Sequence, residues 1–168
     1  MEKKFELTDK FVFNTFGIKL FQIKCTKSFK YAKEGDLGGY VEKDENLDQE
    51  SDAWVSGNAQ VSGNAQVSGD AWVSGNAQVY GNAQVSGDAD IENDNNHCGF
   101  DCFGSCNRHT HAYLTKDNKV EITCGCFRGS IEEFEKEVEK THSGKIYEKQ
   151  YKAIINVIKI KFGLTDLI

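Results

Sequence analysis

The 168-residue sequence contains no proline, a single methionine and no long run of apolar residues. With no proline and with 16 glycines, it cannot be a proline-rich linker protein. It also lacks the stretch of about 18 apolar residues that a membrane-spanning helix needs. The first ten residues, MEKKFELTDK, carry charges but no apolar core, so they predict no secretion signal. These absences predict a cytoplasmic protein.

What is present indicates a folded chain of modest size. Hydrophobic residues make up 39% of the sequence and charged residues 27%, enough for a modest core and too apolar for a disordered chain. The length corresponds to one domain, or to one elongated domain with terminal caps. Six cysteines without an export signal indicate reduced thiols or metal ligands.

The net charge of −6 is distributed unevenly along the chain. Residues 1–33 contain eight lysines and three acids, whereas residues 34–94 contain one lysine and thirteen acids. Within residues 53–87 the only charged side chain is that of Asp70. Acidic groups on both sides of a neutral segment would repel nucleic acid or imitate it, but they are more typical of a solvated face that keeps a repeat soluble. Direct binding to nucleic acid is therefore not predicted.

The middle of the chain repeats every six residues. A β-branched residue recurs at Val55, Val61, Val67, Val73, Val79, Val85 and Ile91. An alanine stands two places before each of them, at Ala53, Ala59, Ala65, Ala71, Ala77, Ala83 and Ala89. A glycine follows two places after six of them, at Gly57, Gly63, Gly69, Gly75, Gly81 and Gly87.

This period excludes an α-helix, because 3.6 residues per turn would spread the valines around the cylinder. Six residues are also too few for two strands and two turns, which excludes an array of hairpins. A parallel β-solenoid fits, with valine inward on a short strand and glycine followed by Asn or Asp at the corner. The pattern resembles the hexapeptide repeat of left-handed parallel β-helices, and that resemblance implies coils of eighteen residues.

The flanking segments are interpreted as caps for a short solenoid whose ends would otherwise be open. The predicted fold class is mainly β: a short left-handed parallel β-helix at 37–94, an N-terminal β cap at 1–36, and a C-terminal cap at 95–168. We expect the C-terminal cap to hold a β-hairpin, with a strand at 120–124, and two α-helices. Ser130 is the predicted N-cap of the first helix, and the apolar stripe of residues 146–162 predicts the second.

Coils of eighteen residues would stack Trp54, Trp72 and Asp90 on one face, next to a column that contains Tyr80. Two stacked tryptophans are a candidate surface for a partner or for a second copy of the chain. A terminal segment of the chain could instead cover them, because large apolar patches are usually buried. A homo-oligomer, either a dimer or a trimer, is expected in every case.

The C-terminal segment is rich in cysteine and histidine, which raises the question of zinc. The residues concerned are His97, Cys98, Cys102, Cys106, His109, His111, Cys124 and Cys126. Their spacings, such as C-x3-C and C-x-C, differ from the paired C-x2-C of common zinc sites. Reduced, partly buried thiols are therefore favoured over a structural zinc ion, and no cofactor is predicted. A Cys–His catalytic pair is disfavoured further, because no orienting acid is nearby in sequence.

Together with its flanks, the sequence resembles a family of phage and prophage proteins with hexapeptide repeats. The resemblance covers Gly35–Val41, Asn46-Leu47, the repeats, and Cys124–Gly129 with the helices that follow. It implies a left-handed β-helix with terminal caps and does not imply a known activity. At Cys106, His111 and Ala112 the sequence departs from the family pattern.

Three functional hypotheses follow. The first is a non-enzymatic, phage-encoded protein that inhibits a bacterial defence system, by binding an effector in the manner of an anti-CRISPR protein or by sequestering a nucleotide signal. Its partner would be a host defence protein or that nucleotide, and its candidate ligand contacts are Arg108, Tyr113 and Arg128. The second is an enzyme resembling hexapeptide-repeat acyltransferases, which is disfavoured because residues 53–91 contain no histidine to act as base. The third is a structural or assembly component of a virion.

Overall fold

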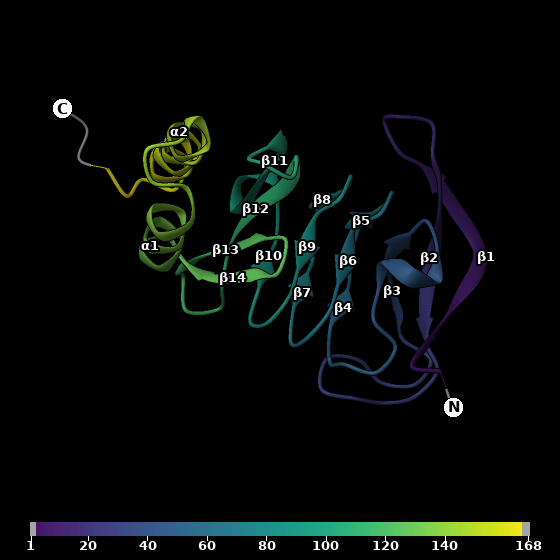
Figure 1. The fold of residues 1–168 in the computed structure, drawn as a ribbon. Coiled ribbons are helices and arrows are strands. Elements are labelled where there is room, and N and C mark those ends of the chain that lie inside the picture. Colours follow the sequence, from purple (N-terminus) through teal and green to yellow (C-terminus); the bar gives the residue numbers. More distant parts are fainter. Residues whose placement is uncertain (1–2, 166–168) are drawn as a thin grey trace. The chain divides into compact units, whose positions relative to one another are not determined.

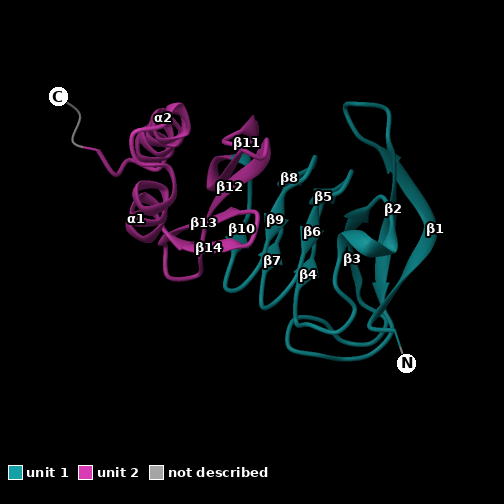
Figure 2. Ribbon diagram, viewed as in Figure 1, with its two compact units in different colours: residues 1–94 teal, residues 95–168 magenta. Residues whose placement is uncertain are grey.

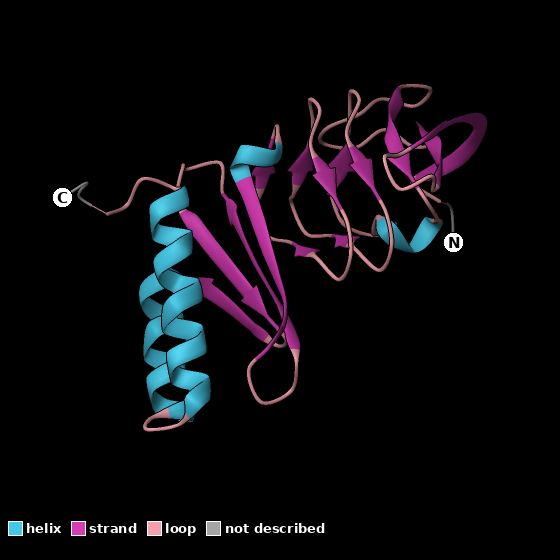
Figure 3. Ribbon diagram, turned by 90° about the horizontal axis from the view of Figure 1, so that it is seen from above, coloured by secondary structure: helices cyan, strands magenta, loops and turns pink. Residues whose placement is uncertain are grey.

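The computed structural model describes residues 3–165 of the chain. The chain divides into two compact units, residues 1–94 and residues 95–168 (Figure 2). The predicted N-terminal cap and the repeats therefore belong to one unit. The described residues form a mainly β structure with two α-helices, which confirms the predicted class at that level (Figure 3).

The repeats form seven strands of two residues each, and strands eighteen residues apart pair in parallel. Trp54 pairs with Trp72 and Trp72 with Asp90, while Gln60 pairs with Gln78 and Gln66 with Gln84. The eighteen-residue coil is thus confirmed. The strands are β4 (Trp54–Val55), β5 (Gln60–Val61), β6 (Gln66–Val67), β7 (Trp72–Val73), β8 (Gln78–Val79), β9 (Gln84–Val85) and β10 (Asp90–Ile91) (Figure 1).

The residue type at each position of the repeat has a physical explanation. The alanines and the β-branched residues are buried in the interior of the coils. The glycine has a positive φ, as at Gly69 with +69°, and an added Cβ there would stand 2.7 Å from the backbone nitrogen of Gly87 in the next coil. Only glycine fits a left-handed corner stacked this closely. Backbone hydrogen bonds join successive coils, for example from Ser56 N to Val73 O (2.8 Å).

Three strands precede the repeats and extend one of their sheets. They are β1 (Phe5–Phe13), β2 (Lys19–Cys25) and β3 (Leu37–Val41), in a sheet of order β1-β2-β3-β5-β8. β1, β2 and β3 are antiparallel neighbours, whereas β3 pairs in parallel with β5 through Tyr40 and Val41. The coils therefore begin at β3, which agrees with the predicted start of the repeats at residue 37.

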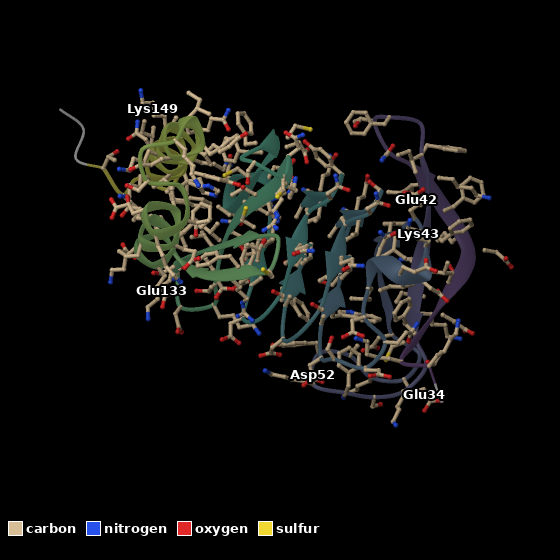
Figure 4. All side chains as sticks on the ribbon, viewed as in Figure 1. Glu34, Glu42, Lys43, Asp52, Glu133 and Lys149 are labelled. Carbon is tan, nitrogen blue, oxygen red and sulfur yellow. The ribbon has the colours of Figure 1, made fainter. Side chains whose placement is uncertain are left out.

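Polar side chains satisfy backbone groups at both ends of the coils. After β3, the amide of the buried Asn46 in a 3₁₀ turn (Asp44–Asn46) donates to Gly63 O (3.1 Å) and Ala65 O (2.8 Å). The carboxylate of Glu42, labelled in Figure 4, accepts from Gly63 N (2.6 Å). At the last coil, Asp94 accepts from Gln78 N (2.8 Å) and so replaces the backbone acceptor that another coil would provide.

The second unit is a four-stranded antiparallel sheet covered on one face by two helices. A second 3₁₀ turn (Asp94–Asn96) leads into β11 (His97–Phe103), β12 (Arg108–Leu114), β13 (Val120–Cys124) and β14 (Phe127–Ser130), in that order across the sheet. The prediction of a single hairpin is wrong, because the histidine- and cysteine-rich segments 97–103 and 108–114 are also strands. Only the strand at 120–124 is correctly predicted.

The helices α1 (Ile131–His142) and α2 (Ile146–Lys161) lie side by side (Figures 1 and 3). Ser130 caps α1 as predicted: its hydroxyl accepts from Glu133 N, and Glu133 accepts from Ser130 N (2.8 Å). Glu133 is labelled in Figure 4. The core between helices and sheet is formed by Ala112, Val120, Ile122, Cys124, Ile131, Phe134, Val138, Tyr151, Ile154, Ile155 and Ile158.

Candidate functional site

The tryptophan column is covered by the chain itself. Trp54 and Trp72 share a face as predicted, but Trp54 is only 2% exposed. The ring of Phe29 meets Trp54 edge-on at 5.4 Å, and Tyr31 meets Trp72 at 4.9 Å. Trp54 is therefore not available as a partner or oligomer face, because a segment of the chain itself covers it, whereas Trp72 is half-buried and stays a prediction.

The covering segment lies between β2 and β3 and is anchored by Asp70, the only charged residue within residues 53–87. Asp70 accepts hydrogen bonds from Lys30 Nζ (2.5 Å) and from the Tyr31 hydroxyl (2.6 Å). The hydrogen bond to Asp70 raises the pKa of Lys30 above its usual value. Asp70 therefore has a structural role. Asp90, which ends the column of Trp54 and Trp72, is half-buried.

Tyr80 stands on another face of the repeats and is exposed, as predicted. Its ring packs against Phe16 with a centroid distance of 5.7 Å. Phe11 and Phe13 lie on the adjoining β1–β2 hairpin, with their centroids 5.6 Å apart. We call these four residues the hairpin patch: Phe11, Phe13, Phe16 and Tyr80. Their side chains are between 46% and 67% exposed, although aromatic residues of this size are usually buried.

The hairpin patch is held on a well-defined backbone. Phe11 pairs with Phe21 and Phe13 with Lys19 in the β1–β2 ladder. The side-chain oxygen of Asn14 accepts from the backbone nitrogens of Phe16 and Ile18, both at 2.9 Å, which fixes the turn. Lys19 Nζ lies 4.0 Å from the ring centroid of Phe11 and 4.8 Å from that of Phe21. This patch is not among the surfaces predicted from the sequence, although Phe11 and Phe13, two residues apart on one strand, must point to the same side.

In the second unit, three imidazoles form a row on the side of β11 and β12 that faces away from the helices. His97 Nδ1 and His111 Nε2 are 2.9 Å apart and share a hydrogen bond. The rings of His109 and His111 are 5.7 Å apart, and His109 Nδ1 pairs with Asp101 at 2.6 Å. Gly99, opposite His111 in the ladder, makes room for the row, because a Cβ there would stand 2.8 Å from His109 Cε1.

The structure separates the residues that suggested zinc. Cys98 and Cys124 belong to the helix-facing core, whereas Cys102, Cys106 and Cys126 are exposed. The histidines alternate with Ala112 and Thr110 along β12 and so point to the opposite side from the two core cysteines. Between residues 3 and 165 no three His, Cys, Asp or Glu side chains converge in a way that could hold a metal ion. Burial raises the pKa of the Cys98 thiol to about 11, which disfavours the thiolate that binds metals.

Two of the three candidate ligand contacts, Tyr113 and Arg128, are joined by Glu121. The buried Tyr113 donates its hydroxyl hydrogen to Glu121 Oε1 (2.8 Å), and Arg128 donates to both oxygens of the same carboxylate. This arrangement pairs the guanidinium charge within the sheet. The observed role of Tyr113 and Arg128 is to link β12, β13 and β14.

Arg108, the third candidate, borders a small cavity of about 140 Å³. The cavity is lined by Arg108, Cys124, Cys126, Phe127, Phe134, Glu137, Val138, Thr141, His142 and Tyr151. Thr110 donates to Cys124 Sγ (3.3 Å), and burial raises the pKa of Tyr151 above its usual value. The His142 ring stacks on the Tyr151 ring at 5.5 Å rather than facing the thiol. This geometry does not provide the base-to-thiol hydrogen bond of a nucleophilic cysteine.

A larger cleft of about 610 Å³ lies in the first unit, near Lys4, Lys27 and Phe29. Lys4 is buried, and its ammonium donates to Ser51 O (2.6 Å) and Ala53 O (2.8 Å). Burial lowers the pKa of Lys4 to about 8. These two hydrogen bonds satisfy backbone carbonyl groups at the start of the repeats, so Lys4 attaches the N-terminal segment to the repeats. The sequence contained no sign of this role, because a lysine near a terminus is normally solvated.

The described helices are too short or too polar to cross a membrane. Comparison with models of protein families finds no match, and comparison with curated proteins finds no relative.

Proposed function

We propose that this chain is a non-enzymatic binding protein whose contact surface is centred on the hairpin patch. The observation that carries the proposal is the exposure of two packed pairs of aromatic side chains at the β1–β2 hairpin, Phe11 with Phe13 and Phe16 with Tyr80, each about half exposed or more. Exposed clusters of large apolar groups are uncommon on monomers and mark interaction sites. Aromatic residues also contribute more binding energy than most others at protein interfaces.

The physical character of the patch favours a protein partner. Its aromatic rings offer a large apolar area with few rotatable bonds, so little side-chain entropy is lost on contact. Lys19 lies against Phe11 at the edge of the patch and adds a positive charge. We therefore expect a partner surface with an apolar centre and an acidic group at its rim.

The more specific proposal rests on the resemblance to phage and prophage hexapeptide-repeat proteins. On that basis the coils are proposed to wind as a left-handed β-helix. The protein is proposed to act in the cytoplasm of a bacterial host, where it would inhibit a defence system. Binding to an effector is preferred over sequestration of its nucleotide signal, because the hairpin patch is apolar and spread over an outer surface.

The test compares the wild-type protein with a variant carrying Phe13→Ala and Phe16→Ala. Both side chains are exposed, so the fold should be retained, and circular dichroism checks this. Each protein is used as bait in lysate of a bacterial host, and bound proteins are quantified by mass spectrometry. In parallel, phage growth is measured on hosts that carry a defence system and express either protein.

We expect a defence protein that binds to the wild-type protein and not to the double variant. Phage growth on the defended host should be lower with the double variant than with wild type. The control is Phe103→Ala, which removes an exposed aromatic ring from β11 and should change neither result. Binding and phage growth that are equal for wild type and double variant would show that the patch is not the contact surface. Phage growth that is the same with and without wild type would reject defence inhibition.

A further inference from the structure

Helix α2 carries apolar residues on two sides. Its inner side places Tyr151, Ile154, Ile155 and Ile158 in the core of the second unit. A second set faces outward, and we call it the outer stripe: Ile146, Ala153, Val157, Ile160 and Leu164. Its four large side chains are between 49% and 61% exposed. A surface helix needs only one apolar side to join its own core, so the outer stripe is not explained by the fold of this unit.

The spacing of the outer stripe is that of a helix–helix seam. Positions 146, 150, 153, 157, 160 and 164 follow one another by four and three residues in alternation, as core positions of a coiled coil do. The one polar position, Gln150, turns aside: its Oε1 accepts a hydrogen bond from Gly104 N (3.0 Å). The remaining five positions are apolar.

The end of the stripe is fixed by a helix-stop motif. Gly163 has a φ of +66°, and the backbone nitrogen of Leu164 donates to Lys159 O (2.8 Å). Gly163 N donates to Ile160 O (3.1 Å), which completes the Schellman pattern. This motif fixes the backbone at Leu164, which follows the last helical residue.

We propose that the outer stripe pairs two copies of this chain, with α2 packed antiparallel on α2 across a two-fold axis. The alternation of four and three residues is the same in both directions, so the stripe is complementary to itself. Antiparallel pairing places Ile146 against Leu164 of the other copy. It also places Ala153 against Val157, a small residue against a larger one, which allows close packing.

The charges beside the stripe are compatible with this arrangement. Lys149, labelled in Figure 4, and Lys161 flank the stripe and are exposed. In the antiparallel pair Lys149 lies opposite Gly163 of the other copy, and Lys161 lies opposite Tyr147. No lysine is placed against a lysine, and Lys161 gains an aromatic neighbour.

The width of the stripe argues for a helix as the occupant rather than a lipid surface. The stripe is one side chain wide, and polar residues such as Lys149 and Asn156 border it. Helices that lie in a membrane surface present a broad apolar face instead. Pairing of two such helices buries on the order of 1,000 Å² in total, at the lower end of specific interfaces. We expect a reversible dimer with a dissociation constant on the order of micromolar.

The first test is sedimentation velocity of the full chain at concentrations from well below to well above micromolar. Wild type should pass from monomer to dimer. Val157→Glu places a charge at the centre of the seam, and it should weaken the dimer at least about tenfold. The control Leu37→Glu alters an equally exposed apolar residue on β3 and should leave the dimer unchanged. Circular dichroism and thermal unfolding confirm that each variant is folded.

The second test fixes the orientation by a charge exchange. Ile146→Glu alone and Leu164→Lys alone should each weaken the dimer. The double variant should recover it, because each Glu then meets a Lys of the other copy at two symmetric places. Both substitutions suit the helix in the monomer, since an acid near its N-terminus and a base near its C-terminus are favourable to the helix dipole.

A wild-type protein that stays monomeric at every concentration would overturn the proposal. A dimer that is insensitive to Val157→Glu would place the contact elsewhere and overturn it as well. Failure of the double variant to recover would reject the antiparallel arrangement. Vesicles of phosphatidylcholine with phosphatidylglycerol provide the remaining check: binding that is lost in Val157→Glu would assign the stripe to lipid.

Discussion

The repeats and the second unit bury their cores in different ways. Between residues 53 and 91 the same few residue types recur, and backbone hydrogen bonds run from one coil to the next. In the second unit the core consists of side chains of different shapes between a sheet and two helices. In the repeats, the backbone position therefore determines which residue type fits. In the second unit, the shapes of the neighbouring side chains determine it. Substitutions should therefore change the free energy of unfolding of the two units in different ways.

The two units can be followed separately in one sample. Both tryptophans, Trp54 and Trp72, lie in the first unit, and both α-helices lie in the second. Tryptophan fluorescence therefore reports unfolding of the first unit, and circular dichroism at the helix band reports mainly the second.

The largest effect is expected from Phe134→Ala in the core of the second unit. Phe134 is buried and contacts both Phe127 and Tyr151, so its removal leaves a cavity that costs about 4 kcal/mol of unfolding free energy. Val73→Ala in the repeats removes less volume and should cost about 2 kcal/mol. Urea unfolding followed by both signals measures the two losses. Equal losses would contradict the idea that the second unit depends more on individual large side chains.

A glycine substitution should cost more at a stacked corner of the repeats than at an open turn. Gly75 has a φ of +60°, and an added Cβ would stand 2.2 Å from Glu92 O, so Gly75→Ala should cost about 3 kcal/mol in the fluorescence-detected transition. Gly144, between the two helices, has a similar φ of +72° but no atom within 4 Å of the added Cβ. Gly144→Ala should cost about 1 kcal/mol, from its backbone conformation alone. A cost at Gly75 no larger than that at Gly144 would show that the stacked corners can move apart.

A smaller effect is expected from pH in the first unit. Lys4 has a pKa of about 8 in the folded protein and 10.5 as its ordinary value. Between these pH values the unfolded chain binds more protons than the folded one, so Lys4 makes the first unit more stable as pH rises from about 8 to 10.5. The gain should be about 1 to 2 kcal/mol after allowance for solvent screening. Lys4→Met should remove this rise, and an unchanged pH profile in the variant would contradict the assignment.

The smallest effect concerns the start of α1. Ser130→Ala removes the hydroxyl that accepts from Glu133 N and should cost about 1 kcal/mol in the helix-detected transition. Ser143→Ala, at the other end of the same helix, should change that transition by much less. A cost at Ser143 equal to that at Ser130 would indicate that helix propensity, and not the cap, determines the result.

The repeats were predictable because one six-residue unit recurs with almost no variation. The period predicted the coil, the pairing of Trp54 with Trp72 and the position of Asp90 after them. It did not predict that Phe29 and Tyr31 cover the column. Those residues lie in a segment without regular structure, and their contact depends on the path of the chain between β2 and β3.

The second unit was predictable only where a local signal exists. Ser130 and Glu133 form a capping pair, and the apolar stripes of the helices have a clear period. β11 and β12 gave no such signal, because both sides of β12 are buried and its apolar and polar residues therefore do not alternate. The histidines of the imidazole row suggest zinc ligands in the sequence, but in the structure His97 Nδ1 bonds to His111 Nε2 and His109 Nδ1 pairs with Asp101.

The eighteen-residue coil also bears on how such a protein can change over generations. Near-identical hexads in a gene invite unequal recombination, which adds or deletes repeats as whole units. Gain of three hexads would keep every later residue on its original face, so the column begun by Trp54 would simply lengthen. Gain of a single hexad inserted between Trp54 and Trp72 would move Trp72 to the next face, away from Tyr31. A gain of one whole coil therefore keeps each residue on its face, whereas a gain of one hexad breaks the contact between Tyr31 and Trp72.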